Sequence, residues 1–151
     1  MKNEDFYPTP KSLIDKMVIG LDYHYRGEIL EPSAGKGDIC DHLKEVMRDA
    51  KLDVIEIEPV LQFTLKGKGY NLVHDDFLTF QTYKKYDLIL ANFPFSAGDQ
   101  HVQKALEILE PYGGRLVCLV NAETIRNPYT NLRKALVAKL TSYGAEIEFL
   151  E

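Results

Sequence analysis

The sequence predicts an α/β fold built on a doubly wound, mostly parallel sheet. Segments with the apolar pattern of buried strands alternate with segments whose apolar residues recur at helical spacing. A glycine-rich turn follows the first expected strand, 28–31, and the second, 52–56, ends in a carboxylate. The segment 116–120 is apolar throughout, which is typical of a central parallel strand. We expect one domain over residues 1–151, with a sheet core at 28–151.

The composition is that of an ordinary globular domain. Hydrophobic residues make up 45% of the chain and charged residues 27%. No apolar run approaches the ~20 residues of a membrane span, and the N-terminus lacks the apolar core of a signal peptide. We therefore expect a cytoplasmic protein without membrane contact. Cys40 and Cys118 sit among apolar residues and share no ligand spacing with the histidines, so we expect reduced core thiols and no metal.

The net charge of −5 argues against a chain that grips nucleic acid by bulk charge. The net charge does not exclude a local basic face. Four basic residues are near one another in sequence, namely Arg126, Arg133, Lys134 and Lys139. An ordinary solvated surface is the alternative interpretation of these side chains.

The N-terminal part, 6–21, is predicted to be a flap followed by a helix. Thr9 is a natural N-cap and Pro10 suits the first helical position. Two interpretations of Phe6 and Tyr7 stay open: a hydrophobic staple on that helix, or a flap over a ligand.

The turn Pro32-Ser-Ala-Gly35-Lys-Gly37 suits a ligand that approaches the backbone, since the following helix supplies unpaired N–H groups. It is not the phosphate-binding loop of nucleotide hydrolases, and position 40, a cysteine, breaks the Gly-x-Gly-x-x-Gly pattern. Glu31, at the end of the strand, would repel a pyrophosphate and attract a cationic ligand.

Two further strand ends carry acidic residues. Glu56 follows the glycine turn at a spacing that suits a carboxylate bound to ribose hydroxyls, although an ordinary exposed carboxylate is equally compatible. Asp75-Asp76-Phe77 follows the strand expected at 70–74. An aspartate beside an aromatic ring can bind an adenine amino group, and a turn or helix cap is the alternative.

The fourth strand delivers Asn92-Phe93-Pro94-Phe95 to its carboxyl end, where open parallel sheets bind ligands. The Asn92 side-chain oxygen and the Phe93 carbonyl can accept from an exocyclic amine, Pro94 stiffens the turn, and Phe95 can stack on the ring. Two acceptors favour a pyramidal nitrogen, whose lone pair can attack a methyl sulfonium held in line. The alternative is a turn capped by Asn92 with both rings in the core.

The rest of the chain predicts a helix from about residue 97 to 109, a polar loop at 121–131 and a last helix at 132–140. Alternation of apolar and charged residues predicts a sixth strand at 146–151.

In this order the motifs resemble those of the class I S-adenosylmethionine-dependent methyltransferases, in particular the amino-methyltransferases typified by DNA adenine-N6 enzymes. The resemblance runs from Phe6 to about Leu150. It implies a Rossmann-like methyltransferase fold, S-adenosyl-L-methionine as cofactor, and nucleic acid, DNA first, as partner. The cofactor-binding residues that it implies are Tyr7, Thr9, Glu31, Ser33, Gly35, Gly37, Glu56, Ile57, Asp76 and Phe77, and the catalytic ones are Asn92, Phe93, Pro94 and Phe95.

The sequence departs from the family at two points. The family's DNA enzymes usually carry Asn or Asp followed by Pro-Pro and an aromatic residue, whereas Phe93 replaces the first proline here. Enzymes that dimethylate adenine in ribosomal RNA also accept an apolar residue at this position. A complete core also has a seventh, antiparallel strand paired with the sixth, so we expect either a truncated chain or a partner chain or oligomer that covers the open edge.

The sequence therefore favours methyl transfer to adenine N6 in DNA, with the base extruded from the duplex. Methylation of RNA adenine or of a protein glutamine is the first alternative, and a non-catalytic S-adenosylmethionine-binding module is the second. A nicotinamide-dependent oxidoreductase is disfavoured by Glu31 and by the glycine pattern.

Overall fold

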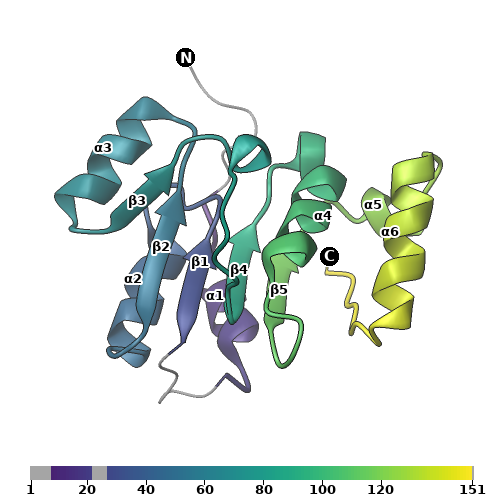
Figure 1. The fold of residues 1–151 in the computed structure, drawn as a ribbon, viewed down its shortest axis with the longest axis horizontal. Helices are drawn as coiled ribbons and strands as arrows, with labels where there is room; N and C mark the ends of the chain where they lie inside the picture. Colours follow the sequence, from purple (N-terminus) through teal and green to yellow (C-terminus); the bar gives the residue numbers. More distant parts are fainter. Residues whose placement is uncertain (1–7, 22–26, 151) are drawn as a thin grey trace.

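The computed structural model describes residues 8–21 and 27–150, which form a parallel sheet with helices on both faces (Figure 1). Within these residues the sheet has five strands in the order β3-β2-β1-β4-β5, and every neighbouring pair is parallel. The strands are β1 (Glu28–Glu31), β2 (Lys51–Ile55), β3 (Asn71–His74), β4 (Leu88–Asn92) and β5 (Arg115–Leu119). The strand order reverses between β1 and β4, as in a doubly wound sheet. The predicted fold class is confirmed.

Helices cover both faces of the sheet. They are α1 (Lys11–Val18), α2 (Asp38–Val46), α3 (Pro59–Gly67), α4 (Gly98–Ile108), α5 (Glu123–Arg126) and α6 (Asn131–Ser142), with 3-10 turns η1 (Phe77–Thr79) and η2 (Phe95–Ala97). In Figure 1, α1 and α2 lie behind the sheet and α4 lies in front of it. The short helix α5 falls inside the segment that the sequence predicted as a polar loop. No helix among the described residues is long and apolar enough to cross a membrane.

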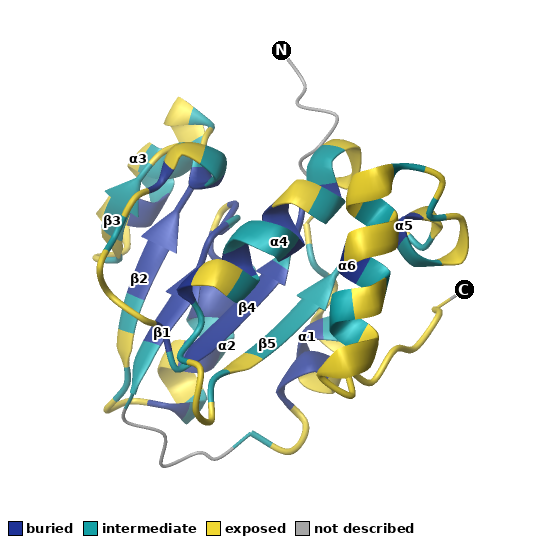
Figure 2. Cartoon of the chain, turned by 45° about the vertical axis from the view of Figure 1, so that its right-hand side comes forward, coloured by how far each residue is buried: buried dark blue, intermediate teal, exposed yellow. Residues whose placement is uncertain are grey.

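The core is densest around the central strands β1 and β4 (Figure 2). Ile29, Leu30, Ile89 and Leu90 are fully buried there. Because successive side chains of a strand point to opposite faces, Leu30 and Ile89 pack with α4 and α6, whereas Ile29 and Leu90 pack with α1 and α2. The continuous apolar runs of these strands thus follow from helices on both faces.

The position of β5 differs from the prediction that this strand is central. It forms the edge of the sheet, and its apolar side chains are half-buried. Leu116 and Cys118 pack toward α4 and α6, and Val117 and Leu119 pack toward the cluster of α1 and α2. The apolar pattern reflects helices on both faces, which an edge strand can also have.

The sixth strand predicted at 146–151 is wrong for the described part of the chain. Residues 145–150 are irregular and exposed, and Glu151 lies outside the described residues. A strand needs a hydrogen-bonding neighbour, and none of the described residues pairs with the outer edge of β5. Alternation alone could not supply that neighbour.

Two side-chain contacts hold this C-terminal segment instead. Glu148 forms an ion pair with Lys16 of α1. The guanidinium carbon of Arg126 lies 4.3 Å from the centre of the Phe149 ring. The partner chain or oligomer that we expected to cover the open edge stays a prediction.

Both cysteines are free, as expected, with Cys40 buried and Cys118 half-buried. Burial raises the pKa of the Cys40 thiol well above its usual range and that of Cys118 to about 12, so both stay protonated and unreactive at neutral pH. Among the described residues, no group of three or more His, Cys, Asp or Glu is arranged to hold a metal ion.

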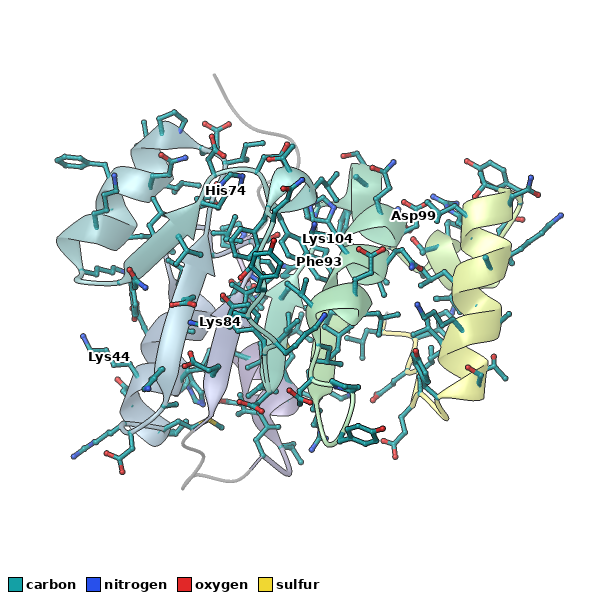
Figure 3. The ribbon with its side chains drawn as sticks, in the orientation of Figure 1. Lys44, His74, Lys84, Phe93, Asp99 and Lys104 are labelled. Atoms are coloured by element: carbon teal, nitrogen blue, oxygen red, sulfur yellow. The ribbon has the colours of Figure 1, made fainter. Side chains whose placement is uncertain are left out.

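A polar network ties the amino ends of the strands together. Asp53 of β2 is 6% exposed and accepts hydrogen bonds from Lys84 Nζ (2.9 Å), Tyr86 Oη (2.8 Å) and Asn71 Nδ2 (2.9 Å). Burial alone would raise the pKa of Asp53, but these three donors outweigh it, so the pKa is lowered. The carboxylate therefore links β2 and β3 to the segment before β4, with Lys84 labelled in Figure 3.

We predict that Asp53→Ala lowers the free energy of unfolding by about 3 kcal/mol at pH 7, because it removes a buried carboxylate with three donors and leaves the buried Tyr86 hydroxyl without its acceptor. The lowered pKa of Asp53 means that this contribution is present at neutral pH and is lost as the pH falls below the usual value of 3.8. Urea unfolding at several pH values measures both effects. Glu107→Ala, at an exposed position of α4, is the control. An Asp53→Ala protein as stable as the wild type at pH 7 would contradict this account.

Candidate active site

A cavity of about 410 Å³ opens at the carboxyl ends of the strands, lined by the segments that follow β1, β2, β3 and β4. Ten of the residues singled out from the sequence line it: Thr9, Glu31, Ser33, Gly35, Glu56, Ile57, Asp76, Phe77, Asn92 and Pro94. Gly37, Phe93 and Phe95 are not part of this lining. Tyr7 lies outside the described residues.

Glu56 clamps the glycine turn. The Gly35 N–H donates to one carboxylate oxygen of Glu56 (2.8 Å), and the Glu58 N–H donates to the other (2.7 Å). Each oxygen keeps a second lone pair, so the Glu56 carboxylate can still accept a hydrogen bond from a further donor such as a ribose hydroxyl. Gly37 has a φ of 99° and a Cβ there would lie 3.2 Å from Leu65, so it is needed for the turn into α2.

Glu31 ends β1 and is only 1% exposed. Its Oε1 accepts a hydrogen bond from the Ser33 N–H (2.8 Å). Burial raises the pKa of Glu31 to about 8; the Ser33 hydrogen bond opposes this rise, and the charge of Glu56 adds a smaller further rise. Such a carboxyl ionises most readily when a cation lies beside it, so Glu31 favours a cationic ligand.

The cavity lining has more acidic than basic side chains. Among the described residues that line it, the only lysine is Lys36, and the six carboxylic side chains are Glu31, Asp38, Glu56, Glu58, Asp75 and Asp76. This excess of negative charge would repel a pyrophosphate and attract a ligand with net positive charge. The charge balance therefore agrees with the argument from Glu31 against a dinucleotide.

Asp76 and Phe77 serve the fold as well as the cavity. The Asp76 side chain accepts from the Leu78 N–H (3.0 Å) and caps η1. Phe77 is 2% exposed, and its ring stacks on Phe93 with centroids 6.2 Å apart and an interplanar angle of 7°. Asp76 therefore caps a turn, as the alternative interpretation of the sequence had it, and also lines the cavity; its binding of an adenine amino group stays a prediction.

Asn92 ends β4 beside the described end of the N-terminal segment. Its Nδ2 donates to Thr9 Oγ1 (3.3 Å). The prediction that Thr9 caps the first helix is wrong, because α1 begins at Lys11 with Pro10 in the N-cap position and no side-chain cap. The Thr9 hydroxyl instead contacts the amide that we expected to hold an amine.

Phe93 is a core residue, 1% exposed, and its ring lies 5.5 Å from that of His101 as well as against Phe77 (Figure 3). Its N–H donates to the carbonyl of Leu119 in β5 (3.1 Å). A buried ring and a strand hydrogen bond thus fix the backbone that a proline would stiffen in the family pattern. Phe95, in contrast, is 47% exposed at the start of η2.

His101 is a cavity residue that the sequence reasoning missed. It lies in the first turn of α4 and is 8% exposed. Its Nδ1 lies 2.7 Å from the carbonyl oxygen of Ala97, and because a carbonyl only accepts, Nδ1 carries the proton. The signal that could have found it is its place in the first turn after the Asn92 segment, which starts at the same edge of the sheet.

Comparison with known proteins agrees with this geometry. No family model matches the sequence. The chain is 30% identical over 88 residues to the type II methyltransferase M.CvrRI of Paramecium bursaria Chlorella virus XZ-6E, a match over 58% of this chain and 23% of that protein. It is 32% identical over 100 residues to the tRNA1(Val) (adenine(37)-N6)-methyltransferase of Aliivibrio fischeri, over 60% of this chain and 43% of that protein. The matches thus span less than half the length of these relatives.

A solved type I restriction-modification methyltransferase subunit from Streptococcus thermophilus superposes with a TM-score of 0.71 at 16% identity, over 95% of this chain and 40% of that one. The chain has the class I methyltransferase fold. The predicted resemblance to S-adenosylmethionine-dependent methyltransferases is confirmed by these matches. A glycopeptide N-methyltransferase, MtfA, solved with S-adenosyl-L-methionine, superposes with a TM-score of 0.60 at 17% identity, over 76% of this chain and 55% of that one. Its bound ligand is the cofactor that the sequence predicted for this chain.

We predict that Glu31→Gln makes the ligand-free protein more stable than the wild type above pH 5. The carboxyl loses its proton near pH 4.5 in the unfolded chain but near pH 8 in the folded one, so wild-type stability falls as the pH rises between these values. The difference should reach on the order of 4 kcal/mol by pH 8 and level off above that pH. Urea unfolding from pH 5 to 8.5 measures it, with Glu107→Gln as control. Parallel wild-type and Glu31→Gln curves would contradict the assignment.

We predict that Phe93→Ala lowers the free energy of unfolding by about 3–5 kcal/mol, because it empties a fully packed site between η1 and α4. Phe63→Ala, at a ring that is 80% exposed on α3, should change stability by less than about 0.5 kcal/mol. Thermal or urea unfolding measures both variants. A small effect at Phe93 would mean that its ring is not the anchor of this segment.

Proposed function

We propose that this chain is a methyltransferase domain that transfers a methyl group from S-adenosylmethionine to the exocyclic amino nitrogen of adenine in DNA. The observation that carries the proposal is the meeting of Glu31 and Asn92 in the wall of one cavity at the carboxyl edge of the sheet. One suits a cationic methyl donor and the other suits an amino acceptor. The methyltransferase matches, M.CvrRI among them, support the same assignment.

The lining fits the proposed cofactor by its charge and by its donor and acceptor groups. Glu31 would face the positive part of the cofactor, Glu56 would accept from the ribose hydroxyls, and Asp76 would accept from the adenine amine. When bound, the cofactor supplies an electrophilic methyl group on a sulfonium. Because three separate segments contribute one carboxylate each, the cofactor would be contacted at three places along its length.

The amine would be held by the Asn92 side-chain oxygen and by the carbonyl of Phe93. Both groups are fixed before any substrate arrives, since Asn92 contacts Thr9 and the Phe93 backbone is bonded to Leu119 in β5. Acceptors that need no reorganisation stabilise the developing positive charge on the nitrogen. Phe95, half exposed beside them, is positioned to stack on an extruded base.

Methylation of adenine in RNA is the second candidate. The match to a tRNA adenine-N6 methyltransferase and the apolar residue at Phe93 favour it. The same acceptors would serve, so the two functions differ in how the nucleotide reaches the cavity and not in the chemistry.

We predict that Asn92→Ala lowers methyl transfer by at least about 100-fold, because it removes one of the two acceptors of the amine. Affinity for S-adenosylmethionine should stay within a few-fold of the wild type. Asn92→Asp, which keeps an acceptor oxygen, is the control and should retain more activity than Asn92→Ala.

The assay uses labelled S-adenosylmethionine with unmethylated double- and single-stranded DNA, ribosomal and transfer RNA, and a protein extract. Label recovered as N6-methyladenine in DNA supports the proposal. Label in RNA adenine would establish the second candidate instead, and label in protein would point to glutamine as the acceptor. Full activity of Asn92→Ala would remove the assigned role of this residue.

A further inference from the structure

An exposed aromatic residue lies shortly before α6, outside the cavity lining. Tyr129 is 68% exposed and lies in the segment between β5 and α6. Asn92 of β4 is paired with Leu119 of β5, so the segments that follow both strands leave the sheet side by side at its carboxyl edge. Figure 1 shows the start of α6 at the same end of the sheet, and Tyr129 lies two residues before α6 in the chain.

The Tyr129 ring lies against a half-buried cation. The guanidinium carbon of Arg133 lies 5.0 Å from the ring centre, and Arg133 Nε lies 3.5 Å from a carboxylate oxygen of Asp99. The side chains of Arg133 and Asp99 are only 17% and 15% exposed. Because its charge is paired with Asp99, Arg133 acts as a support for the ring, and a guanidinium plane is well suited to that contact.

Asp99, the partner of Arg133, connects this support to the Asn92 segment, because it lies only a few residues further along the chain. Asp99 is the second residue of α4, which starts directly after η2, and Figure 3 shows it between α4 and α6. A Cβ built on Gly98 would lie 3.5 Å from Val120, so the start of α4 packs closely on the segment after β5. Phe95 and Tyr129 are therefore two exposed rings on segments that pack against each other.

We propose that Tyr129, positioned by Arg133, is a stacking platform for an unpaired nucleotide next to the target adenine. This inference rests on the proposed function, and it adds a second nucleotide subsite to it. An exposed ring with a fixed orientation stacks on any base, since every base has a π face, and little ordering is left to be done on binding. Lys134, exposed on the same helix turn, can meet the phosphate backbone.

Because the chain contains no tryptophan, an indole introduced at one position reports on that position alone. Tyr129→Trp keeps a stacking ring. Tyr112→Trp places the same fluorophore in the turn before β5, at the amino ends of the strands and away from the cavity. Both proteins are titrated with a single-stranded adenine-containing DNA oligonucleotide. We expect the emission of Tyr129→Trp to fall by about half or more at saturation and that of Tyr112→Trp to stay nearly unchanged.

Affinity provides an independent readout. By fluorescence anisotropy of the labelled oligonucleotide, Tyr129→Ala should bind about tenfold more weakly, and Tyr129→Phe should bind like the wild type because stacking uses the ring and not the hydroxyl. Arg133→Leu should fall between them, because it frees the ring without removing it. Unchanged oligonucleotide affinity in Tyr129→Ala, or equal quenching at both tryptophan positions, overturns the inference.

The two proposals fail in different ways. Wild-type methylation of nucleic acid with no effect of Tyr129→Ala on binding overturns the platform alone. Quenching of Tyr129→Trp by a glutamine-containing peptide, with none by the oligonucleotide, overturns both the platform and a nucleic-acid substrate.

Discussion

The pairing of β1 with β4 is the constraint on which the rest of the site depends. Ile29 pairs with Leu88 and Leu30 with Ile89, although more than fifty residues separate the two strands along the chain. The chain leaves β1 toward α2 on one face and leaves β4 toward α4 on the other, so a crevice opens between the two departures. A carboxylate and an amide that are distant in sequence come to line one cavity there.

Apolar side chains on both faces of the sheet bury this pairing, and two groups of polar side chains lie beside it. At the amino edge, Asp53 is fully engaged by three donors and holds the strands together. At the carboxyl edge, the carboxyl of Glu31 is buried without a cationic partner among the described residues, and its pKa is raised to about 8. The amino ends of the strands are thus held by a satisfied carboxylate, whereas their carboxyl ends keep a buried carboxyl group whose ionisation a cationic ligand would favour.

Sequence reasoning worked where the local pattern decides the outcome. Strand and helix periodicity predicted the five observed strands and the doubly wound fold class, and the motifs at the strand ends predicted ten of the residues that line the cavity. It failed where the position of another segment decides the outcome. The examples are the edge position of β5, the absence of a strand at 146–150 and the cap role of Thr9. The burial of Phe93 was one of the two interpretations of its segment, but its packing between Phe77 and His101 could not be predicted, because those rings come from η1, the residue after β4, and α4.

The central claim is that the acidic cavity at the carboxyl edge holds a cationic methyl donor. Isothermal titration calorimetry with S-adenosylmethionine and, separately, with a nicotinamide dinucleotide tests it most directly. The account predicts saturable one-site binding of S-adenosylmethionine that is lost in a Glu31→Lys variant, and no detectable heat from the dinucleotide. Binding of the dinucleotide without binding of S-adenosylmethionine would contradict it.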